Sequence, residues 1–229
     1  GVFFLMAKLF SGLGLSAIGN LAEYFLVLAG TLLLHGLVTY SAMLKGFTGL
    51  SPITFLRKME DAIMFAFSTA SSNATIPVTM ETAKNRMGVD NKVASFTVPL
   101  GATVNMDGTA IMQGVATAFI AQAYNIDLTM GDYLMVILTA TLASVGTAGV
   151  PGVGLVMLAM VLNQVGLPLE GIALIMGVDR LLDMIRTAVN ITGDSAVTII
   201  VAKSEGAFDE SRFNDPKAGE KEEEVKLAR

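Results

Sequence analysis

Five polar residues recur at helical spacing along an apolar stretch near the C-terminal end of the sequence. Successive members are four, three, four and four residues apart: Asp179, Asp183, Arg186, Asn190 and Asp194. On a helix of about 3.6 residues per turn they lie within roughly 80° of one another, in a stripe about 22 Å long. Two or more carboxylates, a guanidinium and an amide on one face could bind a charged small molecule or a cation. In a soluble protein the same stripe would be an ordinary solvated face.

The pair Asp183 and Arg186 suits an amino acid. The planar guanidinium of Arg186 can bind a carboxylate through two parallel hydrogen bonds, and the Asp183 carboxylate can accept from an ammonium group. An intrahelical salt bridge is the alternative, and when exposed it is worth only about 0.3–0.5 kcal/mol. In an apolar environment such a pair is costly to keep without a ligand.

The composition predicts that the surroundings are a membrane. Hydrophobic residues make up 53% of the chain and charged residues 15%, and 14 of the 35 charged residues fall in residues 203–229. A helix needs about 20 apolar residues to span a bilayer. Uncharged runs of this order occur at 9–22, 24–44, 62–80, 93–106, 108–126 and 133–169. Ionisable groups within a membrane usually line a substrate or ion pathway.

The positive charges predict the orientation. Lysine and arginine mark the cytoplasmic side, and none occurs between residues 93 and 179. Residues 52–87 begin and end among positive charges, whereas residues 129–167 begin and end in loops that carry acids only. Each segment is therefore expected to be a re-entrant hairpin, the first entering from the cytoplasm and the second from outside. The C-terminus is expected in the cytoplasm.

Both expected hairpins have tips rich in small, polar and helix-breaking residues, at 68–77 and 143–152. Interrupted backbone at membrane depth is tolerated only inside protein or beside a watery cavity. An internal echo supports a repeat, because the pattern Asn-x-x-Gly occurs at Asn105 after the first hairpin and at Asn190 after the second. A hairpin and a crossing, repeated in inverted orientation, is typical of secondary transporters.

Four motifs resemble those of the glutamate transporter family, the dicarboxylate/amino acid:cation or sodium:dicarboxylate symporters, in prokaryotic form. They are Ser71-Ser72-Asn73-Ala74-Thr75 with Pro77, Asn105-Met106-Asp107-Gly108-Thr109, Gly146-Thr147-Ala148-Gly149-Val150-Pro151, and the segment 183–194. The resemblance implies an all-α multi-pass membrane protein with eight transmembrane helices, two re-entrant hairpins and interrupted helices in an inverted repeat. It also implies a homotrimer in the cell membrane whose transport domains move like elevators against a scaffold.

On this resemblance the chain is expected to be the C-terminal portion of the family fold, beginning in the fifth helix and lacking the earlier ones. The expected segments are the end of a scaffold-type helix at 1–19, a transmembrane helix at 20–46, hairpin 1 at 52–87, an interrupted transmembrane helix at 93–125, hairpin 2 at 129–167, a C-terminal transmembrane helix at 169–203 and a charged cytoplasmic tail at 204–229.

The resemblance also implies the substrate and its contacts. In this family, Arg at position 186 favours an acidic substrate. Members that carry dicarboxylates, whose substrates have no amine, have a different residue at the position of Asp183. L-aspartate or L-glutamate is therefore the expected substrate. The implied substrate contacts are Ser72, Thr109, Val150, Gly154, Asp183, Arg186, Thr187 and Asn190.

Three sites for a co-transported cation are implied, because hard cations prefer oxygen ligands. Asp194 with main-chain carbonyls of Gly101, Asn105 and Asn190 resembles one sodium site. Carbonyls of Thr103, Ser144, Val145 and Thr147 resemble a second. The third is expected at Asp107 with the Asn105 side chain, completed by residues from an earlier helix.

Several alternatives stay open at this point. The first is coupling to protons, although Gln113 occupies the position where proton-coupled animal carriers have Glu. The second is a C4-dicarboxylate as the substrate. An ion channel is the rival from a different class. With no Cys and one His an enzyme is not expected, nor is a nucleic-acid partner. His35 is interpreted as a packed structural residue, and Arg180 as a second cation near Asp179.

Overall fold

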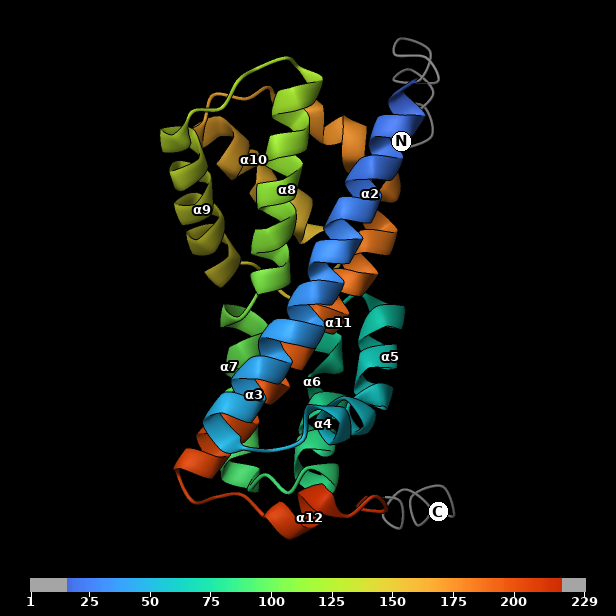
Figure 1. Ribbon diagram of the computed structural model, residues 1–229, viewed down its shortest axis with the longest axis vertical. Coiled ribbons are helices and arrows are strands. Elements are labelled where there is room, and N and C mark those ends of the chain that lie inside the picture. The colour runs from blue at the N-terminus through green and yellow to red at the C-terminus, as the bar shows by residue number, and fades with distance from the viewer. Residues whose placement is uncertain (1–15, 220–229) are drawn as a thin grey trace.

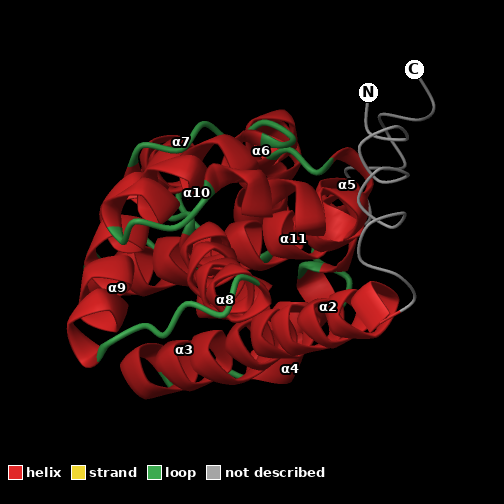
Figure 2. Cartoon of the chain, turned by 90° about the horizontal axis from the view of Figure 1, so that it is seen from above, coloured by secondary structure: helices red, strands yellow, loops and turns green. Residues whose placement is uncertain are grey.

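The computed structural model describes residues 16–219 of the 229-residue chain, so the expected helix end at 1–19 lies mostly outside the described residues. Every element within that range is helical, and its one isolated β-bridge joins Val89 to Phe208. Figure 2 shows the helices packed around one another with short connecting loops.

A long helical rod opens the described chain. It consists of α2 (Ser16–Leu34), a π-helical turn η1 (His35–Thr39) and α3 (Tyr40–Thr48), and it therefore begins at least four residues before the expected start at 20. The rod ends at Gly49, whose φ of 73° is readily adopted only by a residue without a Cβ.

The first helix pair is built from short helices. They are α4 (Pro52–Lys58), α5 (Glu60–Thr69), α6 (Ser72–Glu81) and the π-turn η2 (Thr82–Arg86). Between α5 and α6 the chain reverses at Ala70, which has a φ of 51°, and Ser71 then caps α6 by accepting a hydrogen bond from the Ala74 amide at 3.2 Å.

An interrupted helix follows, as α7 (Asn91–Val104) and α8 (Asp107–Ala123). The break falls at Asn105 and Met106, between the end of α7 and the start of α8. Asp107, the first residue of α8, uses its own Oδ1 to accept from the Gly108 amide at 2.9 Å.

The second helix pair is α9 (Met130–Val145) and α10 (Val153–Gln164). Thr129 and Asp132 form a capping box at the start of α9. Residues 146–152 form the tip, and Gly152 takes a left-handed φ of 80° before α10 begins.

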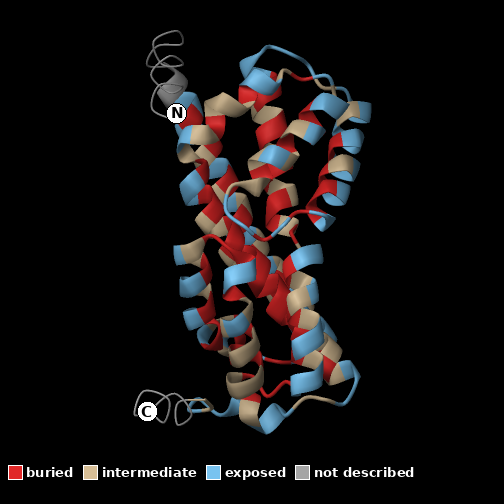
Figure 3. Cartoon of the chain, turned by 180° about the vertical axis from the view of Figure 1, so that it is seen from behind, coloured by how far each residue is buried: buried red, intermediate tan, exposed pale blue. Residues whose placement is uncertain are grey.

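The longest helix, α11 (Ile172–Ser204), follows the short turn η3 (Leu169–Gly171) and packs against most other elements. In Figure 1 the pair α5–α6 lies with α7 in the lower half and the pair α9–α10 lies with α8 in the upper half, while α11 and the rod α2–α3 pass both. The two tips therefore face the middle of α11, where residues 189–196 are all buried. Figure 3 shows buried segments along the centre of the molecule.

The chain after α11 folds back against the lower end. It forms α12 (Glu210–Asn214), and the side chain of Phe213 is fully buried. The Lys58 ammonium donates to the carbonyls of Arg86, Arg212 and Asp215 at 2.6, 3.0 and 2.8 Å. Lys58 thus joins the first helix pair to the C-terminal segment.

Apolar side chains cover much of the outer surface. Within residues 16–219 one helix, spanning 19–48, is long and apolar enough to cross a membrane, and α9 and α10 are apolar but shorter. Large apolar side chains on the rod and on α9 are more than half exposed, among them Leu34, Val38, Leu134 and Ile137. Exposed apolar surface of this extent marks contact with lipid or with other protein.

Candidate functional site

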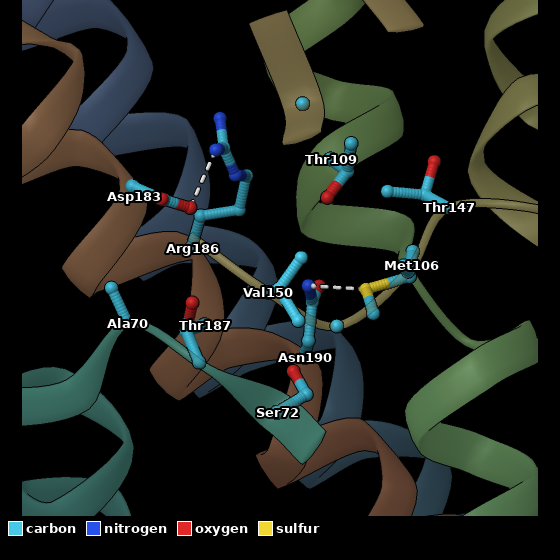
Figure 4. A pocket seen from close by; sticks show the side chains of 13 residues that line it. Ala70, Ser72, Met106, Thr109, Thr147, Val150, Asp183, Arg186, Thr187 and Asn190 are labelled. Carbon is cyan, nitrogen blue, oxygen red and sulfur yellow. Dashed lines mark hydrogen bonds and ion pairs between the residues drawn. The ribbon is translucent and has the colours of Figure 1, made fainter. Parts of the chain in front are cut away.

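A pocket lies where the two tips meet the middle of α11 and the first turn of α8 (Figure 4). Its cavity volume is about 20 Å³. All eight residues expected to contact substrate line it: Ser72, Thr109, Val150, Gly154, Asp183, Arg186, Thr187 and Asn190. Its remaining lining residues are Ala70, Met106, Thr147, Ala148 and Gly149. One pocket thus brings together residues that lie up to 120 positions apart in the sequence, from Ala70 to Asn190.

Arg186 is the central charge of the pocket and is only 2% exposed. Its Nη2 donates to Asp183 Oδ1 at 2.5 Å, and its Nη1 lies 3.6 Å from Asp179 Oδ1, which is too long for a hydrogen bond. Two carboxylates therefore surround one guanidinium. The stripe seen in the sequence is continuous on α11, and all five of its members are buried.

Asp183 also contacts the second tip. Its Oδ2 accepts from the Gly152 amide at 3.0 Å, while its Oδ1 accepts from Arg186. The carboxylate therefore joins α11 to the segment that covers the pocket. Gly154 allows this close approach, because a Cβ there would lie 2.9 Å from Arg186 Nη2.

The two tips are hydrogen-bonded to each other. The Gly149 carbonyl accepts from the Ser71 hydroxyl at 2.7 Å and from the Asn73 amide at 3.1 Å. A Cβ at Gly149 would lie 2.8 Å from Asn73 Oδ1, so this contact needs glycine. Gly149 and Ala70 were not among the predicted substrate contacts, although Gly149 belongs to the Gly-rich motif at 146–151.

Asn190 ties α11 to the break between α7 and α8. Its Oδ1 accepts from the Gly108 amide at 2.8 Å, and its Nδ2 contacts the Met106 sulfur at 3.2 Å. Gly108 leaves the space for Asn190, since a Cβ there would lie 2.7 Å from Asn190 Oδ1. The Asn-x-x-Gly echo thus places Asn190 beside the glycine of the other motif.

The residues expected at the first cation site lie together. Asp194 is 3% exposed, and its Oδ1 accepts from Asn105 Nδ2 at 3.0 Å. The same amide group lies 3.4 Å from the Asn190 carbonyl, and a Cβ at Gly101 would lie 2.6 Å from Asp194 Oδ1. A carboxylate this deeply buried needs a cation or a proton to compensate its charge.

The two groups expected at the third site have different partners. The Asn105 side chain contacts Asp194, whereas Asp107 Oδ2 accepts from His35 Nε2 at 2.6 Å and from the Tyr40 hydroxyl. The interpretation of His35 as a packed structural residue missed this contact. Tyr40 carried no signal in the sequence, because a tyrosine in an apolar helix is common core.

Thr103, Ser144 and Val145, expected at the second site, lie at the ends of α7 and α9, two helices that are in contact. Thr147 lies in the second tip. Ser144 and Thr147 are buried, while Val145 is 46% exposed and Thr103 is exposed. Across residues 16–219 there is no cluster of three or more His, Cys, Asp or Glu side chains that could hold a metal ion. Arg180 is exposed and its side chain forms no part of the pocket lining.

Comparison with known proteins identifies the family of the chain. A family model described as the sodium:dicarboxylate symporter family matches residues 1–204. The chain is 39% identical over 212 residues to a proton/glutamate-aspartate symporter of Escherichia coli K12. The aligned residues make up 93% of this chain and 48% of that protein.

Two further relatives extend the comparison. A proton/sodium-glutamate symport protein of Geobacillus stearothermophilus is 37% identical over 93% of this chain and 50% of its own length, and an excitatory amino acid transporter of Caenorhabditis elegans is 44% identical over 76% of this chain and 35% of its own length. The chain thus spans half or less of the length of these relatives. With a match over residues 1–204 and the relatives above, this chain belongs to the sodium:dicarboxylate symporter family.

Proposed function

We propose that the protein is a secondary active transporter that carries L-aspartate or L-glutamate together with a cation. Sodium is the proposed cation, ahead of the proton. The observation that carries the proposal is Arg186, a buried guanidinium that lines a pocket between two carboxylates and two helix tips. The names of the relatives, which refer to glutamate, aspartate, protons and sodium, agree with this substrate class.

The proposal assigns opposite charges of the substrate to different side chains. The side-chain carboxylate of the substrate pairs with Arg186, and the ammonium group pairs with Asp183. Asn190 and Thr187 serve the α-carboxylate, with Ser72, Thr109, Val150 and Gly154 closing the pocket. Because Asp183 binds Arg186 and the Gly152 amide, a substrate that competes for these contacts also acts on the second tip.

The fold is proposed to span the cell membrane with its C-terminus in the cytoplasm. Residues 52–87 and 129–167 act as re-entrant hairpins of an inverted repeat, 93–125 and 169–203 as the helices that complete its two halves, and 20–46 as a further spanning helix. Support comes from the two tips, which approach the same point of α11 from opposite ends (Figure 1). A homotrimer with elevator-like motion follows from the family resemblance.

Cation coupling is proposed at the sites of Asp194 and Asp107 and at the carbonyls of Thr103, Ser144, Val145 and Thr147. Binding of a cation beside Asp194 strengthens closure over the substrate, and by linkage the substrate strengthens cation binding by the same free energy. Proton coupling is the second candidate, because a relative with 39% identity is named a proton/glutamate-aspartate symporter. Gln113, a buried amide, offers no carboxylate for that proton.

The test is uptake of labelled L-aspartate by the complete gene product in proteoliposomes. An inward sodium gradient is applied first, and then an inward proton gradient without sodium. Saturable, stereospecific uptake driven by sodium supports the proposal, while uptake driven only by protons keeps the substrate and replaces the cation. If neither gradient drives aspartate uptake, the amino-acid assignment is wrong, and C4-dicarboxylates and channel-like conductance are measured next.

A further inference from the structure

The rod α2–α3 contains a π-helical turn at the point where it passes the start of α8. The turn spans His35–Thr39, and the Tyr40 amide donates to the His35 carbonyl, five residues earlier. Such turns are rare and occur frequently at functional sites. Here the two residues joined by that backbone bond are the two whose side chains contact Asp107.

The π-turn changes which face of the helix each side chain occupies. In a regular α-helix, residues five apart point about 140° away from each other. Hydrogen bonding from i to i+5 brings them towards alignment, and the rings of His35 and Tyr40 lie edge to face with centroids 4.9 Å apart. Both rings then reach the same carboxylate oxygen, Asp107 Oδ2. Because an ionised carboxylate only accepts, His35 Nε2 and the Tyr40 hydroxyl are the donors.

Tyr40 also lies close to the buried carboxylate of Asp194. A Cβ at Gly193 would overlap the Tyr40 hydroxyl and would lie 2.6 Å from Asn105 Nδ2, the group that donates to Asp194. Gly193 is therefore the position on α11 that admits both side chains. The Tyr40 hydroxyl lies between Asp107, on α8, and the Asn105–Asp194 contact.

We infer that the π-turn makes His35 and Tyr40 positioning residues for the Asp107 carboxylate, and that they set its geometry for binding the co-transported cation. This inference rests on the proposed symport function. Two donors on Oδ2 and the Gly108 amide on Oδ1 hold the carboxylate in one orientation. A preorganised ligand binds a cation more tightly, because the ordering of the side chain is complete before the cation arrives.

Tyr40→Phe tests the inference, because it removes one donor and keeps the ring. The hydrogen bond goes to a charged group, so its loss is expected to raise the half-saturating sodium concentration about tenfold. Tyr24→Phe is the matched control: Tyr24 lies on the same rod, is 2% exposed, and its hydroxyl has no hydrogen-bond partner among residues 16–219. It is expected to keep the sodium requirement of the wild type.

Two readouts are used on the complete gene product. The first is thermal stabilisation of the purified protein by sodium alone, which reports cation binding without transport. The second is the half-saturating aspartate concentration at saturating sodium. Weaker sodium binding with preserved aspartate affinity supports the inference. Unchanged sodium binding in Tyr40→Phe, or an equal weakening in Tyr24→Phe, overturns it.

His35 provides a second, independent pair of variants. Gln can place an amide donor where His35 has Nε2, whereas Leu has none, so His35→Leu is expected to weaken sodium binding several-fold more than His35→Gln. Equal effects of both variants contradict a role through the hydrogen bond. If no cation gradient drives aspartate uptake by the wild type, the proposed function fails and the inference fails with it. If the wild type does show cation-driven uptake but the variants bind sodium as the wild type does, only the inference is rejected.

Discussion

Among single side chains, Asp183 decides how the pocket is held together. One of its oxygens pairs with Arg186 on its own helix, and the other accepts from the Gly152 amide on the second tip. A carboxylate with two such partners can exchange one of them for an ammonium group at small net cost, since the new partner replaces a bond that is given up. This exchange is the physical basis for proposing that substrate binding and tip position are linked.

Arg186→Lys is expected to weaken aspartate binding about 100-fold, because Lys keeps the charge but loses the planar fork, and a truncated buried charge pair typically costs 2–5 kcal/mol. Half-saturation of uptake and competition by neutral amino acids are measured. Arg180→Lys is the control, since Arg180 lies on the same helix but is exposed. Similar losses in both variants would argue against Arg186 as the substrate's partner.

Asp194→Asn is expected to abolish sodium-dependent stabilisation, because the amide has nearly the same shape but no charge to bind a cation. Sodium titrations of thermal unfolding, with and without aspartate, measure the effect. Asp127→Asn removes an exposed carboxylate and is expected to leave the titration unchanged. Sodium-driven uptake at the wild-type level in Asp194→Asn would remove Asp194 from the proposed cation site.

At the level of elements, the two tips are joined because the first supplies hydrogen-bond donors and the second supplies the acceptor. The first tip presents the Ser71 hydroxyl and the Asn73 amide at the start of α6, and the second presents the Gly149 carbonyl. Neither pair of helices could satisfy these polar groups within itself, since the backbone at both tips is non-helical. Residues of both tips line the pocket, so their contact lies at its border.

Gly149→Ala is expected to separate the tips and to raise the half-saturating aspartate concentration at least tenfold. The added Cβ would lie 2.8–3.1 Å from three atoms of Asn73, two of which belong to its side chain and one to its backbone. Gly146→Ala is the matched control in the same tip, because its Cβ would meet no atom within 4 Å and its φ of −100° suits any residue. A normal aspartate affinity in Gly149→Ala would show that the contact is dispensable.

For the whole molecule, the C-terminal segment connects parts that are distant in sequence. Lys58 in α4 donates to three carbonyls, two of which lie beyond α11, and the Arg212 side chain donates to the Asn85 carbonyl at 2.7 Å. The lower helix pair and the end of α11 are therefore held as one unit.

Lys58→Met is expected to lower the melting temperature by roughly 5–10 °C, because three carbonyls lose their donor at about 1 kcal/mol each and each kcal/mol is worth about 2–4 °C in a chain of this size. Thermal unfolding of the complete gene product measures the shift. Lys45→Met removes an exposed lysine and is expected to shift the melting temperature by less than about 2 °C. An unchanged melting temperature in Lys58→Met would mean that water replaces the ammonium group.

The membership of the chain in its family was predictable from the sequence because four motifs and their order are local properties of the chain. The stripe on α11 was predictable for the same reason, since residues three and four apart share a helix face whatever surrounds it. The expected tips at 68–77 and 143–152 contain the chain reversal at Ala70 and the break at 146–152, whereas Pro77 lies inside α6.

Which groups become neighbours was decided by the tertiary structure. His35 and Tyr40 reach Asp107 across 72 and 67 residues, and only the packed positions of the rod and α8 bring them together. The Asn105 amide could have served Asp107 or Asp194, and the structure pairs it with Asp194. A π-turn has no strong sequence signature, so the side-chain register beyond it could not be read from a period of 3.6. Local patterns in the sequence thus determined the family, the helix faces and the interruptions. Long-range packing decided the partners of each buried charge. Those partners depend on how several helices are placed together, which no local pattern specifies.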